Sequence, residues 1–250
     1  MAAGFVIVAG IVSMAMRLGM GRSLLVASLR TAGQLGLAAL ALDFVFNLST
    51  LWAVGPLAVL MLALAGREAL RRQKFKLPGS SLDTIGSMAL SSFVVAITVT
   101  GVVVGAKPWW SPPVFIPLLG MILGNALNGV SISLDRFLSG CVEQRARIEA
   151  KLLLGATPNE ATLDLAREAL RLGLTPMINA MSIVGIVSLP GMMTGQLLAG
   201  ADPTQAVLYQ IVVMYMLAAT VALGSFMVVG LARRRVFDAD EALRRDLKRK

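Results

Sequence analysis

Long apolar stretches dominate the chain and alternate with short polar ones. Six of them hold 16 to 25 predominantly apolar residues each: 31–48, 51–66, 85–106, 112–134, 174–198 and 207–231. A helix of about 20 residues crosses the ~30 Å hydrocarbon core of a bilayer. A shorter apolar stretch covers residues 2–16. The pattern therefore predicts an all-α fold, a polytopic integral membrane helical bundle.

The stretch 2–16 has the length of a signal-peptide core, so cleavage after it is one alternative. However, no basic segment precedes it, and Arg17, Arg22 and Arg30 follow it. This order of charge is the reverse of that in a secretory signal. We therefore expect the stretch to be retained as a first span, which gives about seven transmembrane helices with the N-terminus outside.

The basic residues lie between alternate apolar stretches. If 17–30, 67–84, 135–173 and 232–250 face the cytoplasm, these segments hold 22 of the 23 Lys and Arg residues, and only Lys107 lies on the other side. Cytoplasmic loops of membrane proteins carry the Lys/Arg excess. The distribution predicts an N-out/C-in orientation and a basic cytoplasmic tail at 232–250.

Composition limits the class of protein further. The chain has 250 residues, of which 56% are hydrophobic and 15% charged, which leaves room for a single transmembrane domain, 1–250. Its net charge of +9 requires no nucleic-acid partner, because juxtamembrane basic residues attract anionic lipid headgroups. We expect membrane lipids as partners instead. The one cysteine, Cys141, excludes an internal disulfide.

The segment 135–173 is predicted to form a pair of cytoplasmic helices. The first contains Glu149 and is expected to end at Gly155, which suits a left-handed C-cap. Thr157, Pro158 and Glu160 then supply an N-cap, a first-turn proline and the partner of a capping box. We expect the second helix to end at Gly173, where Thr175 and Pro176 start the next span. Such a helix pair offers a surface to a partner; a solvated connector is the alternative.

Several motifs resemble those of known transporter subunits. The sequence from Glu149-Ala150 to Gly155-Ala156-Thr157-Pro158 resembles the EAA loop of ABC importer permeases, although the later Leu-Pro of that loop is absent. A longer resemblance is to the FetB (YbbM)-type ABC transporter permease family. It rests on Pro117–Asn125, Leu152–Pro158, Val184–Gly195, Ala199–Pro203 and Tyr209–Ile211.

This resemblance implies a permease subunit of an ABC transporter in the bacterial inner (cytoplasmic) membrane. The implied function is export of iron or another metal species, and some plant relatives imply a nucleotide sugar as an alternative solute. A homodimer would work with a cytoplasmic ABC ATPase that binds ATP and Mg²⁺, so the chain itself is neither an enzyme nor a cofactor carrier. Its implied ATPase-coupling residues are Glu149, Gly155, Ala156, Thr157, Pro158 and Glu160.

The source of energy also follows from what the sequence lacks. It contains no G-x-x-x-x-G-K-[ST] phosphate-binding loop, so ATP hydrolysis belongs to a separate chain. None of its 14 acidic residues lies deep in a predicted span. Gradient-driven carriers usually place ionisable groups there, so a gradient-driven secondary carrier is the weaker hypothesis, as is a non-transporting membrane protein.

Polar, methionine and helix-breaking residues in two spans mark a candidate substrate path. Amides are costly when they face lipid, and unwound backbone within a bundle commonly builds a substrate site. The alternative is that the asparagines join helices and the methionines fill gaps. With no histidine and no deep carboxylate, a tight site for a hard metal ion is not expected. The path residues are Asn125, Asn128, Ser131, Asn179, Pro190, Gly191, Met192, Met193, Thr194 and Gln196.

Overall fold

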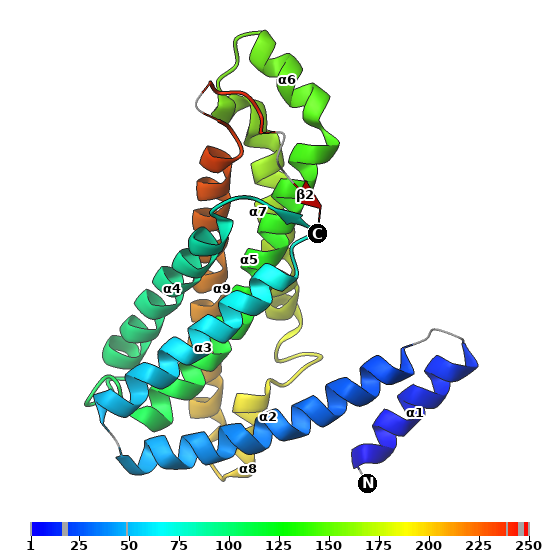
Figure 1. Cartoon of the computed structure of the whole chain (residues 1–250). Coiled ribbons are helices and arrows are strands. Elements are labelled where there is room, and N and C mark those ends of the chain that lie inside the picture. Colours follow the sequence, from blue (N-terminus) through cyan, green and yellow to red (C-terminus); the bar gives the residue numbers. More distant parts are fainter. Residues whose placement is uncertain (1, 17–19, 49, 239, 245–247, 250) are drawn as a thin grey trace. The chain divides into compact units, whose positions relative to one another are not determined.

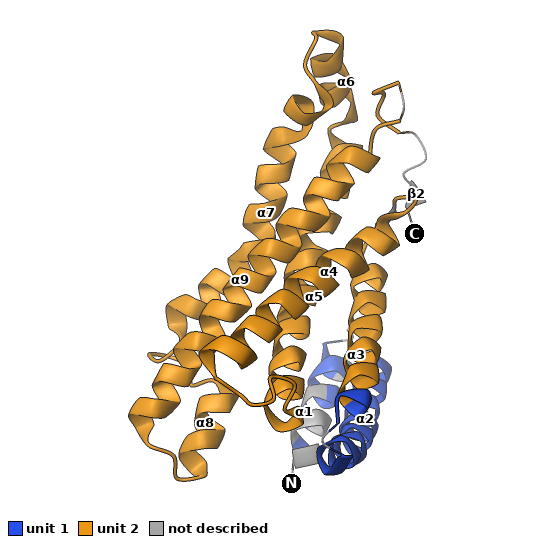
Figure 2. Cartoon of the chain, turned by 90° about the vertical axis from the view of Figure 1, so that its left-hand side faces the viewer, with its two compact units in different colours: residues 1–53 blue, residues 54–250 orange. Residues whose placement is uncertain are grey.

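The computed structural model describes residues 2–16, 20–48, 50–238, 240–244 and 248–249. The chain divides into two compact units, residues 1–53 and 54–250 (Figure 2). In the first unit, α1 (Ala2–Ala15) and α2 (Gly21–Leu48) pack against each other. The amide of Met20 donates a hydrogen bond of 3.1 Å to the hydroxyl of Ser13 between the two helices.

The second unit is a helical bundle. Its elements are α3 (Leu51–Arg71, from residue 54 on), α4 (Ser80–Thr98), a π-helical turn η1 (Val99–Val103), α5 (Pro112–Glu143), α6 (Arg145–Leu153), α7 (Pro158–Ile183), α8 (Gly191–Leu198) and α9 (Pro203–Arg235). Two short strands, β1 (Phe75–Lys76) and β2 (Lys248–Arg249), pair antiparallel. Among the described residues, α2, α3, α4 with η1, α5 and α9 are long and apolar enough to cross a membrane. The predicted all-α, multi-pass membrane fold is confirmed; the number of spans and the orientation stay predictions.

Helix α5 lies at the centre of the second unit and packs against α4, α7 and α9 (Figure 1). Phe137 and Leu134 of α5 are fully buried, together with Met88 of α4 and Val228 of α9. Outside the membrane, removal of such side chains from water is the main free-energy contribution that favours packing. Within the membrane, close van der Waals contact between helices is a main contribution instead.

Small residues bring α5 and α7 close together. A Cβ atom on Gly173 of α7 would lie 2.9 Å from the backbone oxygen of Gly129 of α5, closer than real Cβ atoms approach. The prediction that Gly173 ends a helix is therefore wrong, because this glycine serves packing. Helix α7 continues through Pro176, and the Thr175 hydroxyl donates to the backbone oxygen of Arg171 at 2.7 Å instead of capping a new helix.

The predicted segment 135–173 also differs at its start. Helix α5 extends to Glu143, so its residues from Asp135 on continue a membrane helix, and the separate helix pair is α6 with the first part of α7. The sequence signal for the turn within that helix pair was correct. The signal for a helix boundary near residue 135 was weak, because residues 130–139 contain no proline or glycine.

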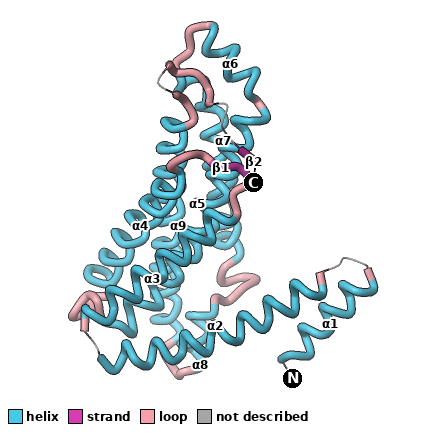
Figure 3. Tube along the Cα trace, in the orientation of Figure 1, coloured by secondary structure: helices cyan, strands magenta, loops and turns pink. Residues whose placement is uncertain are grey.

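The predicted span 174–198 is not one helix. Helix α7 ends at Ile183, residues 184–190 form a turn, and α8 has 8 residues, a length of about 12 Å. Figure 3 shows this linker as a loop between α7 and α8. Gly185 has a φ of 83°, and its amide donates to the Ser188 oxygen at 2.9 Å. The apolar pattern continues through residues 184–190, so the sequence did not indicate that the helix ends there. Gly185 and Pro190 permit the break in the helix.

Candidate functional site

The turn between α6 and α7 is closed by side-chain and backbone hydrogen bonds. Gly155 has a φ of 90°, and its amide donates to the Leu152 oxygen at 2.9 Å. The amide of Ala156 donates to the Lys151 oxygen at 3.0 Å, which completes a Schellman motif. These bonds pair the Lys151 and Leu152 carbonyl oxygens at the end of α6.

Helix α7 begins with the capping box that the sequence predicts. The Glu160 amide donates to the Thr157 hydroxyl oxygen at 3.3 Å, and the Thr157 amide donates to the Glu160 carboxylate at 2.8 Å. Pro158 occupies the first turn of the helix. Hydrogen bonds from the Thr157 amide and the Thr157 hydroxyl, each of 2.8 Å, hold the pKa of the Glu160 carboxyl below its usual range, so this carboxylate stays ionised over a wide pH range.

Further contacts hold α6 in place. Lys151 of α6 pairs with Asp164 of α7 at 3.1 Å, which lowers the pKa of the Asp164 carboxyl. Arg145 pairs with Glu149 at 2.8 Å and donates to the backbone oxygen of Leu243 in the C-terminal segment at 2.6 Å. The buried Ile148 fixes the inner face of α6. The turn is therefore a rigid feature at one end of the second unit (Figures 1 and 2).

Two leucines at this turn are almost fully exposed. Leu153 and Leu154 have exposed fractions of 89% and 88%. Both come directly before Gly155, among the charged residues of α6 and α7. An apolar pair at such a position is typical of a surface that another molecule covers. Sequence reasoning missed these leucines, because a Leu-rich end of a helix ordinarily indicates burial.

A second group of candidate residues surrounds α8. Met192 and Gln196 line a cavity of about 460 Å³, together with Met121 of α5 and Tyr209 of α9. Met193 lines a different cavity of about 520 Å³. Adjacent residues of one short helix thus face two separate spaces, and the sequence-predicted methionines are brought to both of them.

The second cavity contains an unusual polar group. Its lining includes Met181 of α7, Met193 of α8, and Gln210, Met214 and Tyr215 of α9. Gln210 is 6% exposed, and its Oε1 atom has no hydrogen-bond partner among the described residues. A buried, unpaired amide oxygen costs about 1–3 kcal/mol, so it is a candidate to bind a passing solute. The sequence offered no signal for it beyond a lone glutamine in an apolar helix.

The other candidate residues near α8 line neither cavity. Pro190 precedes α8 and Gly191 begins it, while the Thr194 hydroxyl donates to the Pro190 oxygen at 3.1 Å. Gln196 Oε1, like that of Gln210, has no partner among the described residues.

The predicted asparagines do not join this group. Asn125 donates from its side chain to the Met121 oxygen of its own helix at 2.9 Å. The Asn128 side-chain oxygen accepts a hydrogen bond of 2.6 Å from Arg72, which directly follows α3. Ser131 is buried and donates to the Asn128 oxygen at 3.1 Å. Asn179 is exposed on α7. Asn128 therefore joins α5 to the residue that follows α3, and it lines neither of the cavities around α8.

The donor atoms of the cavities limit what they can bind. Among the described residues, no group of three or more His, Cys, Asp or Glu side chains is arranged to hold a metal ion. The cavities instead present thioether sulfur atoms and amide oxygens. Thioethers favour soft metal ions, and neutral amides bind any ion only weakly.

Comparisons with known proteins agree with this architecture. Residues 1–237 match the uncharacterised protein family UPF0014. A UPF0014 membrane protein of Synechocystis sp., slr1647, is 36% identical over 217 residues, which is 86% of this chain and 83% of that protein. The probable iron export permease protein FetB of Escherichia coli is 34% identical over 164 residues, 64% of this chain and 63% of that protein.

A plant relative is also similar. The protein ALUMINUM SENSITIVE 3 of Arabidopsis thaliana is 31% identical over 219 residues, 87% of this chain and 79% of that protein. No solved structure matches the chain. The match over residues 1–237 and the similarity to slr1647 show that the chain belongs to the UPF0014 family of membrane proteins.

Proposed function

We propose that the chain is the membrane-spanning permease subunit of an ABC transporter that exports iron or another metal species. ATP and Mg²⁺ bind to a separate cytoplasmic ATPase, which docks on the α6–α7 turn. The observation that carries this proposal is the exposed Leu153–Leu154 pair on a turn made rigid by the Thr157–Glu160 capping box.

The shape of the turn supports transmission of movement. A partner that pushes on a flexible loop would move only the loop, but this turn is fastened to two helices. Helix α7 runs for 26 residues from the turn to the α7–α8 linker, which borders the cavity at Gln210. A displacement at Pro158 would therefore reach the cavity through one continuous helix.

The cavities around α8 supply the proposed substrate path. Met192, Met193, Gln196 and Gln210 offer soft sulfur and neutral oxygen donors. Weak donors suit transit, because a transported species must leave the site as readily as it enters. This chemistry fits a soft or chelated metal better than a bare hard cation. The relative named a probable iron export permease supports a metal as the cargo.

A homodimer is part of the proposal. Gly191 and Gly195 lie one turn apart on α8, and a Cβ atom on either would meet no atom within 4 Å. Small residues with open space beside them let a second helix approach closely. A second copy of the chain is the expected neighbour.

Purification with a candidate ATPase tests the proposal. The complex is reconstituted into proteoliposomes, and ATP hydrolysis is measured with and without iron salts, iron chelates and a nucleotide sugar. We expect hydrolysis to rise with an iron species. A rise with the nucleotide sugar alone would mean that the transported solute is not a metal, while the chain would still be an ABC permease. Failure of any candidate ATPase to bind, with transport driven by an ion gradient, would favour a secondary carrier.

A further inference from the structure

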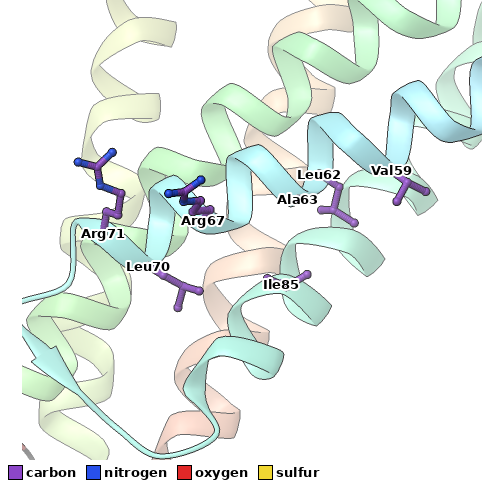
Figure 4. A pocket seen from close by; sticks show the side chains of 7 residues that line it. All are labelled: Val59, Leu62, Ala63, Arg67, Leu70, Arg71 and Ile85. Atoms are coloured by element: carbon purple, nitrogen blue, oxygen red, sulfur yellow. The ribbon is translucent and has the colours of Figure 1, made fainter.

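A groove lies between α3 and α4, away from the cavities around α8. It has a volume of about 500 Å³. Its apolar lining includes Val59, Leu62 and Leu70 of α3 and Ile85 of α4. Figure 4 shows Leu62 and Leu70 pointing from α3 toward the side on which α4 presents Ile85. None of these residues belongs to the proposed docking turn or substrate path.

The two helices meet closely at Gly66, and space remains beside this contact. A Cβ atom on Gly66 of α3 would lie 2.7 Å from Cγ1 of Ile85. The absence of a side chain at Gly66 thus permits the contact. Beside the contact, Val59 and Leu70 line open space instead of packing against α4. An elongated apolar channel remains along α3.

One end of the groove carries two cations. Arg67 and Arg71 line it and are one helical turn apart, and Figure 4 shows both side chains extending from α3 on the same side, away from Leu70 and Ile85. No carboxylate of the described residues lies within ion-pair distance of Arg67. Arg71 approaches Glu68 only at 3.8 Å, and Glu68 also pairs with Arg72 at 3.4 Å. The basic end therefore has an excess of positive charge.

The acidic residue in the first turn of α4 does not cancel this charge. Asp83 accepts a hydrogen bond of 3.0 Å from Arg235 of α9. Two guanidinium groups at the end of an apolar groove match the chemistry of a phosphate group attached to hydrocarbon.

The length of the groove fits one leaflet of the bilayer. From Val59 to Arg71 the helix rises about 18 Å, and half of the ~30 Å hydrocarbon core is about 15 Å. An acyl chain that begins at the arginines would thus lie along the groove to about the middle of the membrane. A water-soluble phosphate compound would leave the apolar part of the groove unfilled.

We propose that this groove binds one anionic phospholipid, with its phosphate between Arg67 and Arg71 and an acyl chain against Val59, Leu62 and Ile85. The lipid would fill the gap between α3 and α4 and stabilise their contact at Gly66. The proposal does not depend on the transport function.

Native mass spectrometry of the full chain tests it. The protein is reconstituted into nanodiscs that contain equal amounts of phosphatidylglycerol and phosphatidylcholine with identical acyl chains, and the retained lipid is identified after release. We expect one retained phosphatidylglycerol. Loss of both charges in Arg67→Gln with Arg71→Gln should lower the preference for phosphatidylglycerol about 30-fold.

Matched variants separate the site from general charge. Arg167→Gln with Arg171→Gln removes the same charge from an exposed pair on α7 and should change nothing. Ala63→Phe fills the groove and should release the lipid although both arginines remain. Arg67→Lys with Arg71→Lys should retain most of the preference, which covers the case in which the glutamine variant does not fold.

Three results would contradict the proposal. One is equal retention of the two lipids by the wild-type protein. Another is a loss of phosphatidylglycerol in the α7 control as large as in the groove variant. Displacement of the lipid by glycerol phosphate, which has no acyl chain, would also contradict the role given to the apolar groove.

Discussion

Two turns of the second unit share one backbone design but lie at opposite ends of it (Figure 1). The first is Gly155-Ala156-Thr157-Pro158, between α6 and α7, and the second is Gly200-Ala201-Asp202-Pro203, between α8 and α9. The two glycines have φ angles of 90° and 84°. In both turns a Schellman motif ends one helix, and an N-cap followed by proline starts the next. An exposed leucine precedes each turn: Leu154 before the first, and Leu198, which is 85% exposed, before the second.

The difference lies in the charges around the turns. The α6–α7 turn is flanked by Glu149, Lys151, Glu160 and Asp164, whereas Asp202 is the only charged residue between 191 and 232. Turn geometry alone therefore does not define a docking site. The exposed leucines at the first turn lie among charged residues, whereas Leu198 lies among apolar ones. The second turn provides matched controls for the labelling, docking and backbone predictions that follow.

Accessibility to a thiol reagent should separate the two turns completely. Native Cys141 is fully buried, so the wild-type protein should remain unlabelled on both sides of the membrane. In a Cys141→Ala background, Leu198→Cys should react with an impermeant maleimide in intact cells. Leu153→Cys should react only after permeabilisation. Labelling of Leu153→Cys from outside would overturn the orientation predicted from the basic residues.

The exposed leucines should dominate binding of the ATPase. Leu153→Ser with Leu154→Ser removes two side chains whose burial by a partner would contribute about 1.5–3 kcal/mol each, so we expect docking to weaken about 100-fold or more. The permease itself loses no packing, and its thermal stability should not change. Co-purification with the ATPase measures the effect, and Leu198→Ser is the control. Unchanged co-purification would remove the leucines from the interface.

The backbone of the first turn should matter next. At Gly155 a Cβ atom would meet no neighbour within 4 Å, so the effect of a substitution comes from its φ of 90° alone. A left-handed conformation costs a residue with a side chain about 1–2 kcal/mol, and a β-branched one resists it further. Gly155→Val should weaken docking about tenfold, whereas Gly200→Val should strain its own turn by as much and leave docking intact. Equal loss in both variants would indicate general damage.

These two turns also show which features the sequence could predict. Caps, helix starts and left-handed glycines depend on residues a few positions apart, so the α6–α7 turn could be predicted from Gly155, Thr157 and Glu160. Gly173 carries a similar local signal but lies where α5 and α7 cross, and only the tertiary contact with Gly129 reveals its role. The break after Ile183 was hidden because the apolar pattern continues through it.

The candidate site was predictable only in part for the same reason. Met192, Met193 and Gln196 are close in sequence and line cavities in the structure, but their partners Gln210, Met181 and Met214 come from other helices. Asn128 was expected beside them because it is polar and near mid-span. It bonds Arg72 instead, a contact between residues 56 positions apart that no local pattern indicates.

Removal of the unpaired amide in the cavity should separate function from stability. Gln210→Leu replaces a buried group whose Oε1 atom has no partner among the described residues, so the thermal stability should stay equal or rise. If the amide oxygen binds the passing solute, transport should fall about fivefold, the value of one hydrogen bond. Gln205→Leu, at an exposed position near the second turn, is the control. Normal transport by Gln210→Leu would exclude this oxygen from the path.

The smallest expected effect is a pH dependence confined to the first turn. The Thr157 amide and hydroxyl lower the pKa of Glu160, so its carboxylate favours the folded turn. That contribution is fully present above the unfolded pKa of about 4.3. It disappears as the pH falls through the lower, folded pKa.

Hydrogen exchange of the Thr157 amide, corrected for its intrinsic rate, should therefore lose protection only in acid. Glu160→Gln should show weaker protection without this pH dependence. A loss of protection between pH 5 and 8 would mean that some other group controls the turn, since the sign of the Glu160 shift permits none there.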